Sequence, residues 1–382
     1  MNARMKRWIA PLSLVLGFAA GPAFAQISAL ERTPQADFTI DAATRNATID
    51  SLVIALRDNY VFPDVAEKMG KAIRARQKRG EYEKITSAAE FADSLQSHVH
   101  AVYPDKHLRI HHSHDPLPMH LEHEAQQTPE QIAADRRFAA WANQGFMKVE
   151  RMSGNLGYVD IILFMDGDEA AATASAAMNF LANSDAIIVD LRRNGGGSPD
   201  MVAFVTTYLF GAEPVHLNDL YMRKTNSTEQ HWTLPYVPGK RSTGKDVYVL
   251  TSSHTGSAAE EFAYNLKTRK RATLIGERTA GGANPGDMVR LGDHFGAFIA
   301  NGRAINPITK TNWEGTGVEP DVAVPADDAL KTAQTMALKK LLATNTNPEE
   351  QKKIQRALDE VQTSAAAASA APAPKAMATG SK

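Results

Sequence analysis

The stretch that decides the fold is Ala186-Ile-Ile-Val-Asp190-Leu-Arg-Arg-Asn194-Gly-Gly-Gly197-Ser198. Its pattern predicts a buried strand that runs into a glycine turn and then into a helix. Similar units lie on both sides of it, with strands expected at 156–162, 246–251 and 272–275, and helices at 170–181, 199–209 and 258–267. Strands that alternate with helices are typical of βαβ units around a largely parallel sheet. The sequence therefore predicts an α/β fold.

The segment before this core has a different hydrophobic pattern. Between residues 41 and 102 the apolar side chains recur at helical spacing, and two breaks divide them into three helices. Thr128-Pro129-Glu130 predicts the start of a helix that runs through residue 141. After the core, residues 288–291 and 295–300 predict a hairpin. From Thr363 on the chain is a low-complexity tail, which we expect to be disordered.

The first residues resemble a secretory signal peptide. Three cations and no acid precede an apolar stretch, and Ala23-Phe-Ala25 provides a cleavage site. We therefore expect four parts: a signal peptide over 1–25, a helical subdomain and linker over 26–145, a catalytic domain over 146–340, and a C-terminal helix with the tail over 341–382. No segment is long and apolar enough to predict a membrane span. We therefore expect a periplasmic or secreted protein.

Composition excludes several functions. The chain has no cysteine, which rules out disulfides, thiol nucleophiles and cysteine metal sites. The net charge of -1 becomes more negative without the cations of the leader, so nothing indicates nucleic-acid binding. The sequence leaves the oligomeric state open, and we expect neither a cofactor nor a metal.

The glycine run is the first candidate site. At the C-terminal end of a strand, glycines leave backbone N–H groups free to face a ligand, and the following helix N-terminus favours negative charge. The run matches neither a dinucleotide nor a phosphate-loop motif. A plain tight turn between strand and helix is the alternative.

Ser257 is the second candidate. It follows a predicted strand and Gly256, and it opens a helix, where a nucleophile would have the N–H of Ala258 beside it. Ser257-Ala-Ala-Glu260 is also a capping box, however, and the same four residues begin at Ser87 in the helical subdomain. Only the context of Ser257, after a buried strand and in the sheet that carries the glycine run, distinguishes the two.

Histidine is the usual base for a serine nucleophile. His107 lies where a helix is expected to give way to a strand, and His254 ranks second because it precedes the serine turn. The region holds seven further histidines, whose spacing fits no metal-ligand signature: His98, His100, His111, His112, His114, His120 and His123. A solvated polar segment explains them better than a metal site. Glu314 is either a polar member of the site or a carboxylate on a turn.

Several motifs in this order resemble the tail-specific (C-terminal processing) proteases, in the branch that includes interphotoreceptor retinoid-binding protein and tricorn protease. They are Asp190-Leu-Arg-Arg-Asn-Gly-Gly-Gly, Ser257-Ala-Ala-Glu-Glu-Phe, Gly276-Glu-Arg-Thr-Ala-Gly-Gly-Ala and Glu314-Gly-Thr-Gly-Val-Glu-Pro-Asp. The resemblance spans roughly residues 41 to 324. It implies a crotonase-like ββα superhelix core behind an N-terminal helical subdomain.

The resemblance also implies roles for individual residues. Ser257 would be the nucleophile, with the amides of Ala258 and of either Gly196 or Gly197 as the oxyanion hole. Better-known members use a lysine base in the segment that here contains no lysine, residues 280–283. The tricorn-like arrangement fits His107 as the base, with Glu314 as a polar supporter. Lys106 stands where tricorn has a serine that orients the histidine, a task that Asp105 can take over.

These residues predict a serine-type peptidase that cleaves peptide or protein substrates. Too few residues separate His107 from Gly154 for an inserted PDZ domain. Two alternatives remain open: a non-catalytic carrier of an apolar ligand, as the retinoid-binding relatives suggest, and an esterase with the same catalytic groups.

Overall fold

The computed structural model describes residues 36–118 and 128–370, and for 364–370 only the backbone. The expected signal peptide and the histidines at 120 and 123 lie outside these residues. The helices are α2 (Ala42–Asn59), α3 (Pro63–Lys78), α4 (Ala88–His100), α5 (Pro129–Trp141), α6 (Asp168–Phe180), α7 (Pro199–Thr207), α8 (Ala258–Thr268), α9 (Ala326–Thr344) and α10 (Pro348–Ala370).

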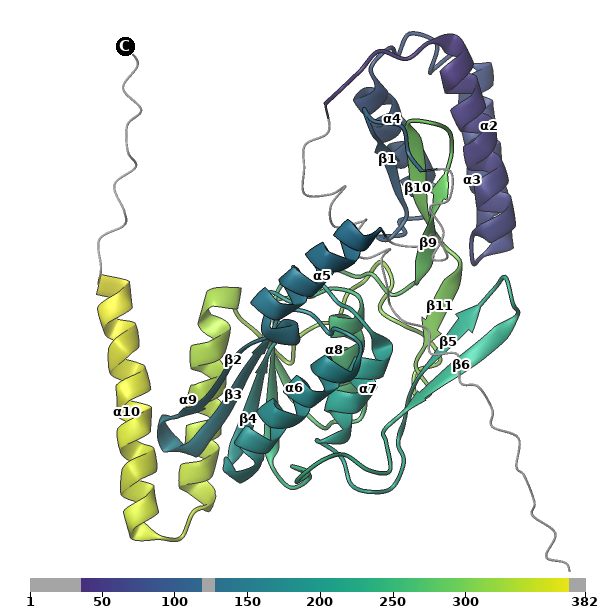
Figure 1. Cartoon of the computed structure of the whole chain (residues 1–382). Coiled ribbons are helices and arrows are strands. Elements are labelled where there is room, and N and C mark those ends of the chain that lie inside the picture. The colour runs from purple at the N-terminus through teal and green to yellow at the C-terminus, as the bar shows by residue number, and fades with distance from the viewer. Residues whose placement is uncertain (1–35, 119–127, 371–382) are drawn as a thin grey trace, which may run out of the picture.

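A six-stranded mixed sheet forms the centre of the molecule (Figure 1). Its strands, in spatial order, are β12 (Val322–Ala323), β8 (Thr273–Gly276), β7 (Asp246–Thr251), β4 (Ala186–Asp190), β3 (Leu156–Ile161) and β2 (Phe146–Met152). All neighbouring pairs are parallel except β2 with β3. The predicted α/β core with its largely parallel strands is confirmed.

Helices cover both faces of this sheet, which explains why its central strands are mostly apolar. Ile187 and Val189 of β4 pack toward α6, α7 and α8, whereas Ile188 between them packs toward α9 and α10. Successive side chains of a strand point to opposite faces, so one short strand contributes to two separate cores. The glycine run and Ser257 therefore lie at the same edge, at the C-terminal ends of β4 and β7.

The N-terminal helical subdomain is confirmed, and a strand pair from much later in the chain completes it. The three-stranded antiparallel sheet has the order β1 (Arg109–His112), β10 (Phe295–Ala300) and β9 (Gly286–Arg290). Phe295 and Ile299 are buried in one core with Leu52 of α2 and Phe91 of α4. Figure 1 shows this sheet beside α2, α3 and α4. The hairpin thus joins the two halves of the chain.

A third sheet, with the order β11 (Gly302–Ile305), β5 (His216–Met222) and β6 (Ser227–Trp232), extends from the core. At the other end of the chain, α10 continues to Ala370. The expectation of disorder from Thr363 on is therefore wrong for residues 363–370, which are rich in alanine, the residue with the highest helix propensity. The rest of that tail, residues 371–382, lies outside the described residues. Among the helices described, none is long and apolar enough to cross a membrane.

Candidate active site

Ser257 occupies a strained turn between β7 and α8. Its backbone angles, φ 52° and ψ -121°, are unusual for a residue with a side chain, and such strain gathers at functional sites. Ser87, which begins the same tetrapeptide, has ordinary extended angles (φ -81°, ψ 130°), and its Oγ accepts a hydrogen bond from the N–H of Glu90 at 3.0 Å. Ser87 is thus a simple helix cap, and its ordinary backbone angles distinguish it from Ser257.

Glu260 holds the serine turn from below. Its side chain is fully buried, and its carboxylate accepts hydrogen bonds from the N–H groups of Ser257 (2.9 Å), Gly281 (2.7 Å) and Gly282 (2.9 Å) and from the hydroxyl of Thr279. Burial raises the pKa of Glu260, and these four donors act against that rise. Glu260 therefore ties the serine turn to the turn at residues 281–282.

The glycine run lies directly against Ser257. A methyl group on Gly196 would come within 2.7 Å of Ser257 Cβ and 3.2 Å of the Ala258 nitrogen. Both Gly196 and Gly197 have left-handed backbone angles (φ +127° and +126°). At both positions the turn requires glycine, because a side chain would be strained and would clash.

The amides near Ser257 differ in what they bind. The N–H of Gly196 donates to Asn194 Oδ1 at 2.8 Å. Among the described residues, the N–H groups of Gly197 and Ala258 have no hydrogen-bond partner. These two donors are free to bind an oxygen atom beside Ser257.

His107 lies in the loop between α4 and β1, as the sequence predicts. Asp105, which is fully buried, fixes this loop: its Oδ1 accepts from the N–H of His107 (2.9 Å) and of Leu108 (3.1 Å), and its Oδ2 accepts from the Tyr60 hydroxyl (2.9 Å). The imidazole packs on Gly282, where a methyl group would lie 2.9 Å from Nε2. The loop thus presents the ring to the same turn that Glu260 holds.

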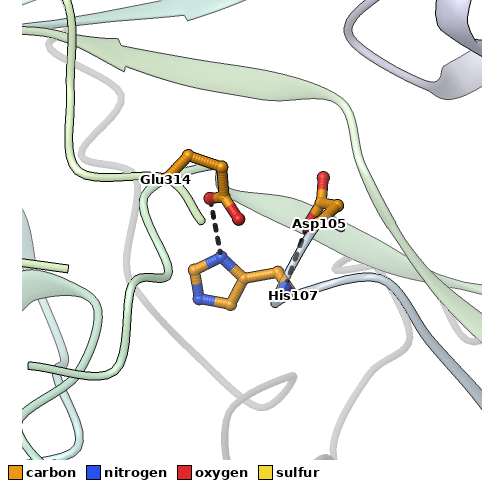
Figure 2. Close-up of side chains that lie close together, drawn as sticks. All are labelled: Asp105, His107 and Glu314. Carbon is orange, nitrogen blue, oxygen red and sulfur yellow. Dashed lines mark hydrogen bonds and ion pairs between the residues drawn. The ribbon is translucent and has the colours of Figure 1, made fainter. Parts of the chain in front are cut away.

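Glu314 approaches His107 from the other side (Figure 2). Its Oε2 lies 4.0 Å from Nδ1 of His107, too far for a hydrogen bond. The carboxylate accepts instead from the N–H groups of Lys106 (2.9 Å), Ala283 (2.6 Å) and Asn284 (3.0 Å). Glu314 is therefore no turn carboxylate in solvent: its side chain is 4% exposed and links three segments.

Burial moves the pKa values of both groups. It raises the pKa of Glu314 to about 7, with a further contribution from the charge of Asp105. It lowers the pKa of His107, whose Nδ1 has no hydrogen-bond partner among the residues described. A histidine that is neutral near pH 7 can accept a proton.

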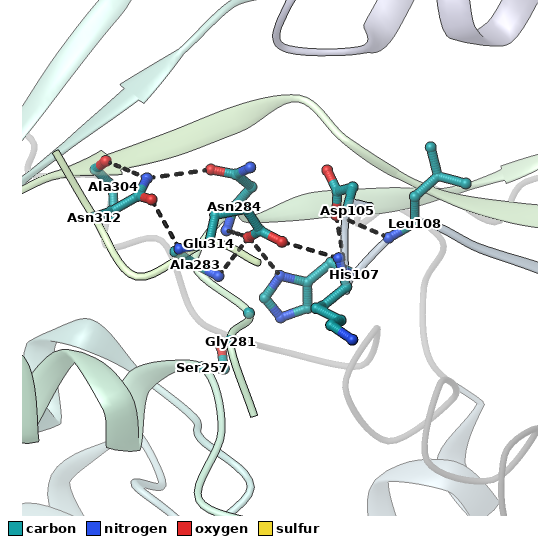
Figure 3. Close-up of polar contacts among 12 residues, drawn as sticks. Asp105, His107, Leu108, Ser257, Gly281, Ala283, Asn284, Ala304, Asn312 and Glu314 are labelled. Carbon is teal, nitrogen blue, oxygen red and sulfur yellow. Dashed lines mark hydrogen bonds and ion pairs between the residues drawn. The ribbon is translucent and has the colours of Figure 1, made fainter. Parts of the chain in front are cut away.

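Figure 3 shows Ser257 and His107 on either side of the turn at Gly281. In the described parts of the chain, no hydrogen bond joins these two side chains. The side chain of His254 is exposed, and its N–H donates to Ser252 Oγ at 3.0 Å. The structure thus brings His107, Asp105 and Glu314 together, with Ser257 next to the glycine run across the turn.

Sequence reasoning missed the role of Glu260. Its spacing from Ser257 has a complete local explanation as a capping box, which drew attention away from the segment at 279–282. The signal that could have found it is burial: a glutamate in an otherwise apolar helix face requires partners.

The chain resembles known proteins in both of its halves. Residues 155–324 match the model of peptidase family S41, and residues 42–146 match the model described as the N-terminal domain of Peptidase_S41 in eukaryotic IRBP. Carboxyl-terminal-processing peptidase 2, chloroplastic, of Arabidopsis thaliana is 27% identical over 175 residues, which are 45% of this chain and 32% of that protein. Tricorn protease of Thermoplasma volcanium is 28% identical over 203 residues, 49% of this chain and 17% of that protein.

The chain therefore spans less than half the length of these curated relatives. Among solved structures, a Parabacteroides merdae protein that has been suggested to be a peptidase superposes with a TM-score of 0.52 at 17% identity, and the match covers 75% of this chain and 92% of that one. This likeness supports the fold.

Proposed function

Because the chain belongs to peptidase family S41, we propose that it is a serine peptidase that hydrolyses peptide bonds through an acyl-enzyme on Ser257. One observation carries the proposal: the strained Ser257 turn lies against Gly196 of the glycine run, and the N–H groups of the next residues in the two segments, Ala258 and Gly197, have no hydrogen-bond partner among the described residues. A helix cap needs neither the strain nor the second segment.

Each group has a task in this reaction. His107 takes the proton of Ser257 Oγ as the hydroxyl attacks the substrate carbonyl carbon. The carbonyl oxygen becomes negative and accepts hydrogen bonds from the N–H groups of Ala258 and Gly197. Of the two glycines considered, Gly197 suits this task, since Gly196 already donates to Asn194. His107 then protonates the leaving amine, and water releases the acyl group.

The two carboxylates near His107 act through it. Asp105 fixes the backbone of the histidine loop, and Glu314 in its ionised form places negative charge 4.0 Å from Nδ1, where it stabilises the imidazolium that forms in the reaction. Both are positioning residues. A proton transfer requires His107 and Ser257 to come within hydrogen-bond distance, and such contacts often tighten only when substrate binds.

The proposal includes the setting of the enzyme. The expected signal peptide and the bacterial and chloroplastic relatives support a periplasmic or secreted peptidase that acts on peptides or proteins. The names of the relatives favour cleavage near carboxyl termini. Without a PDZ domain between His107 and Gly154, such termini would have to be recognised by the catalytic domain itself.

Labelling with a fluorophosphonate probe tests the nucleophile. The probe should label the wild-type chain, and the label should be lost in Ser257→Ala and reduced strongly in His107→Ala. Ser87→Ala is the matched control, because it changes the same tetrapeptide at an ordinary helix cap and should label normally. A label that persists in Ser257→Ala would refute the proposal.

The match of residues 42–146 to a domain found in eukaryotic IRBP favours one second candidate, a carrier of an apolar ligand. A folded wild-type chain that never labels and that carries lipid in native mass spectrometry would establish this function. An esterase would label like a peptidase, so amide and ester substrates with the same acyl group separate those two.

A further inference from the structure

Three potential metal ligands meet away from the candidate active site. Glu229 and His231 are two positions apart on β6, so they point to the same face of the strand, and β6 contacts α7. Asp200 lies in the first turn of α7. One ligand atom from each of these residues lies within 4.8 Å of the others.

The buried histidine is the second observation. His231 is 5% exposed, and in the described part of the chain neither of its ring nitrogens has a hydrogen bond. Its Nε2 lies 3.6 Å from Asp200 Oδ1 and 3.8 Å from Glu229 Oε1. These distances are too long for hydrogen bonds. They are close to the separation of about 3.4 Å between two ligand atoms of a tetrahedral ion with bonds of about 2.1 Å.

The carboxylates can adjust to an ion more easily than the histidine can. Asp200 and Glu229 have side chains that are 59% and 52% exposed, so they can move by a few tenths of an ångström at little cost. His231 is held by its burial. The cluster thus combines one fixed nitrogen ligand with two mobile oxygen ligands.

A residue that can serve the other ring nitrogen lies on the neighbouring strand. A histidine that binds a metal through Nε2 carries its proton on Nδ1, which then needs an acceptor. Asn218 stands directly opposite His231 in the β5–β6 register and is fully buried, and its Oδ1 has no hydrogen-bond partner among the described residues. Side chains at directly opposed positions lie close enough to meet. Asn218 can therefore fix the tautomer that leaves Nε2 free.

The surroundings of the cluster favour a cation. It lines a pocket of about 600 Å³ to which Asp166 and Asp168 also contribute, and no lysine or arginine belongs to the described lining. The pocket is open, so an ion can enter and water can complete its coordination.

We propose that Asp200, Glu229 and His231 bind a divalent transition-metal ion of the zinc type. One nitrogen and two carboxylate ligands suit such an ion, whereas magnesium and calcium prefer oxygen alone. The ion ties the β5–β6 hairpin to the start of α7, and thus to the helix that directly follows the glycine run. This site is independent of the proposed peptidase activity.

Isothermal titration of the metal-free full chain with Zn²⁺ tests the site. The wild type should bind one ion with micromolar or tighter affinity, and Mg²⁺ should not compete. His231→Gln and Asp200→Asn should each weaken binding at least tenfold. Asp168→Asn is the matched control, since it removes the same charge from the same pocket without removing a ligand, and should bind within twofold of the wild type.

His107→Gln separates this site from the group of Asp105, His107 and Glu314, which could also hold an ion. Zinc binding that is lost in His107→Gln and kept in His231→Gln would overturn the proposal, as would a wild-type chain that binds no zinc. Equal weakening in Asp168→Asn and Asp200→Asn would show general attraction of cations and also overturn it. Circular dichroism of the metal-free variants checks folding; if His231→Gln is unfolded, Glu229→Gln at the exposed ligand replaces it.

Discussion

Gly282→Ala would displace the His107 imidazole without removing it. The new methyl carbon would lie 2.8 Å from Cε1 and 2.9 Å from Nε2 of the ring. Carbon atoms pack at about 3.5 Å or more, so the ring must retreat by roughly 0.7 Å. It can do so, because the His107 side chain is 25% exposed.

The expected cost falls on activity rather than on stability. A displacement of about 1 Å in a reacting group can reduce rates by about 100-fold, so we expect fluorophosphonate labelling to slow by about 10- to 100-fold. Gly282 does not have a left-handed backbone angle, and its neighbour is a side chain that can move. The free energy of unfolding should therefore fall by only about 1 kcal/mol, the low end of the cost of inserting an extra methyl group into a packed site.

The assay is the rate of labelling at fixed probe concentration, with urea unfolding of each variant in parallel. Gly211→Ala is the matched control, because no atom lies within 4 Å of the added methyl group. In a His107→Ala background, Gly282→Ala should cause no further loss, since the two changes act through the same ring. Two results would refute His107 as the base: labelling of Gly282→Ala at the wild-type rate, or a loss from Gly282→Ala in the His107→Ala background as large as its loss in the wild type.

Three further predictions concern buried ionisable groups. Because burial lowers the pKa of His107 from its ordinary value of 6.5, the labelling rate should fall with decreasing pH with its midpoint below 6.5; a midpoint at or above 6.5 contradicts this. In Glu260→Gln the new side-chain NH₂ group faces backbone N–H groups and cannot accept their hydrogen bonds. The free energy of unfolding in urea should therefore fall by about 2 to 4 kcal/mol, and an unchanged urea midpoint would be inconsistent with the four hydrogen bonds. Burial raises the pKa of Glu261 to about 8, so the folded state binds a proton that the unfolded state releases above about pH 4.5, and stability should fall by up to about 1.4 kcal/mol per pH unit between about 5 and 8. Glu261→Gln should flatten this slope in urea unfolding at several pH values; an identical slope in the variant would argue against it.

Local patterns predict most of the elements. The expected strand at 246–251 and helix at 129–141 agree with β7 and α5 at both ends, because residue periodicity and caps act over short distances. The hairpin at 288–300 is also predicted, but its partner β1 is not, since pairing between segments so far apart leaves no trace in either one alone.

The candidate site shows the same division. Ser257 and the glycine run are visible from their turns, and the choice between Gly196 and Gly197 depends on which N–H is already bound. That information requires coordinates. Glu260 and His231 are visible only through their burial and their partners, which come from other segments.

The shared core of α2, α4 and β10 has a consequence for synthesis. The N-terminal helices leave the ribosome long before residues 286–300, and until that hairpin arrives their apolar faces lack Phe295 and Ile299. The core of the N-terminal helices therefore stays incomplete until the last third of the chain has been synthesised. His107, Ser257 and Glu314 come together only then, so a half-made chain holds none of the completed site and cannot act on its neighbours.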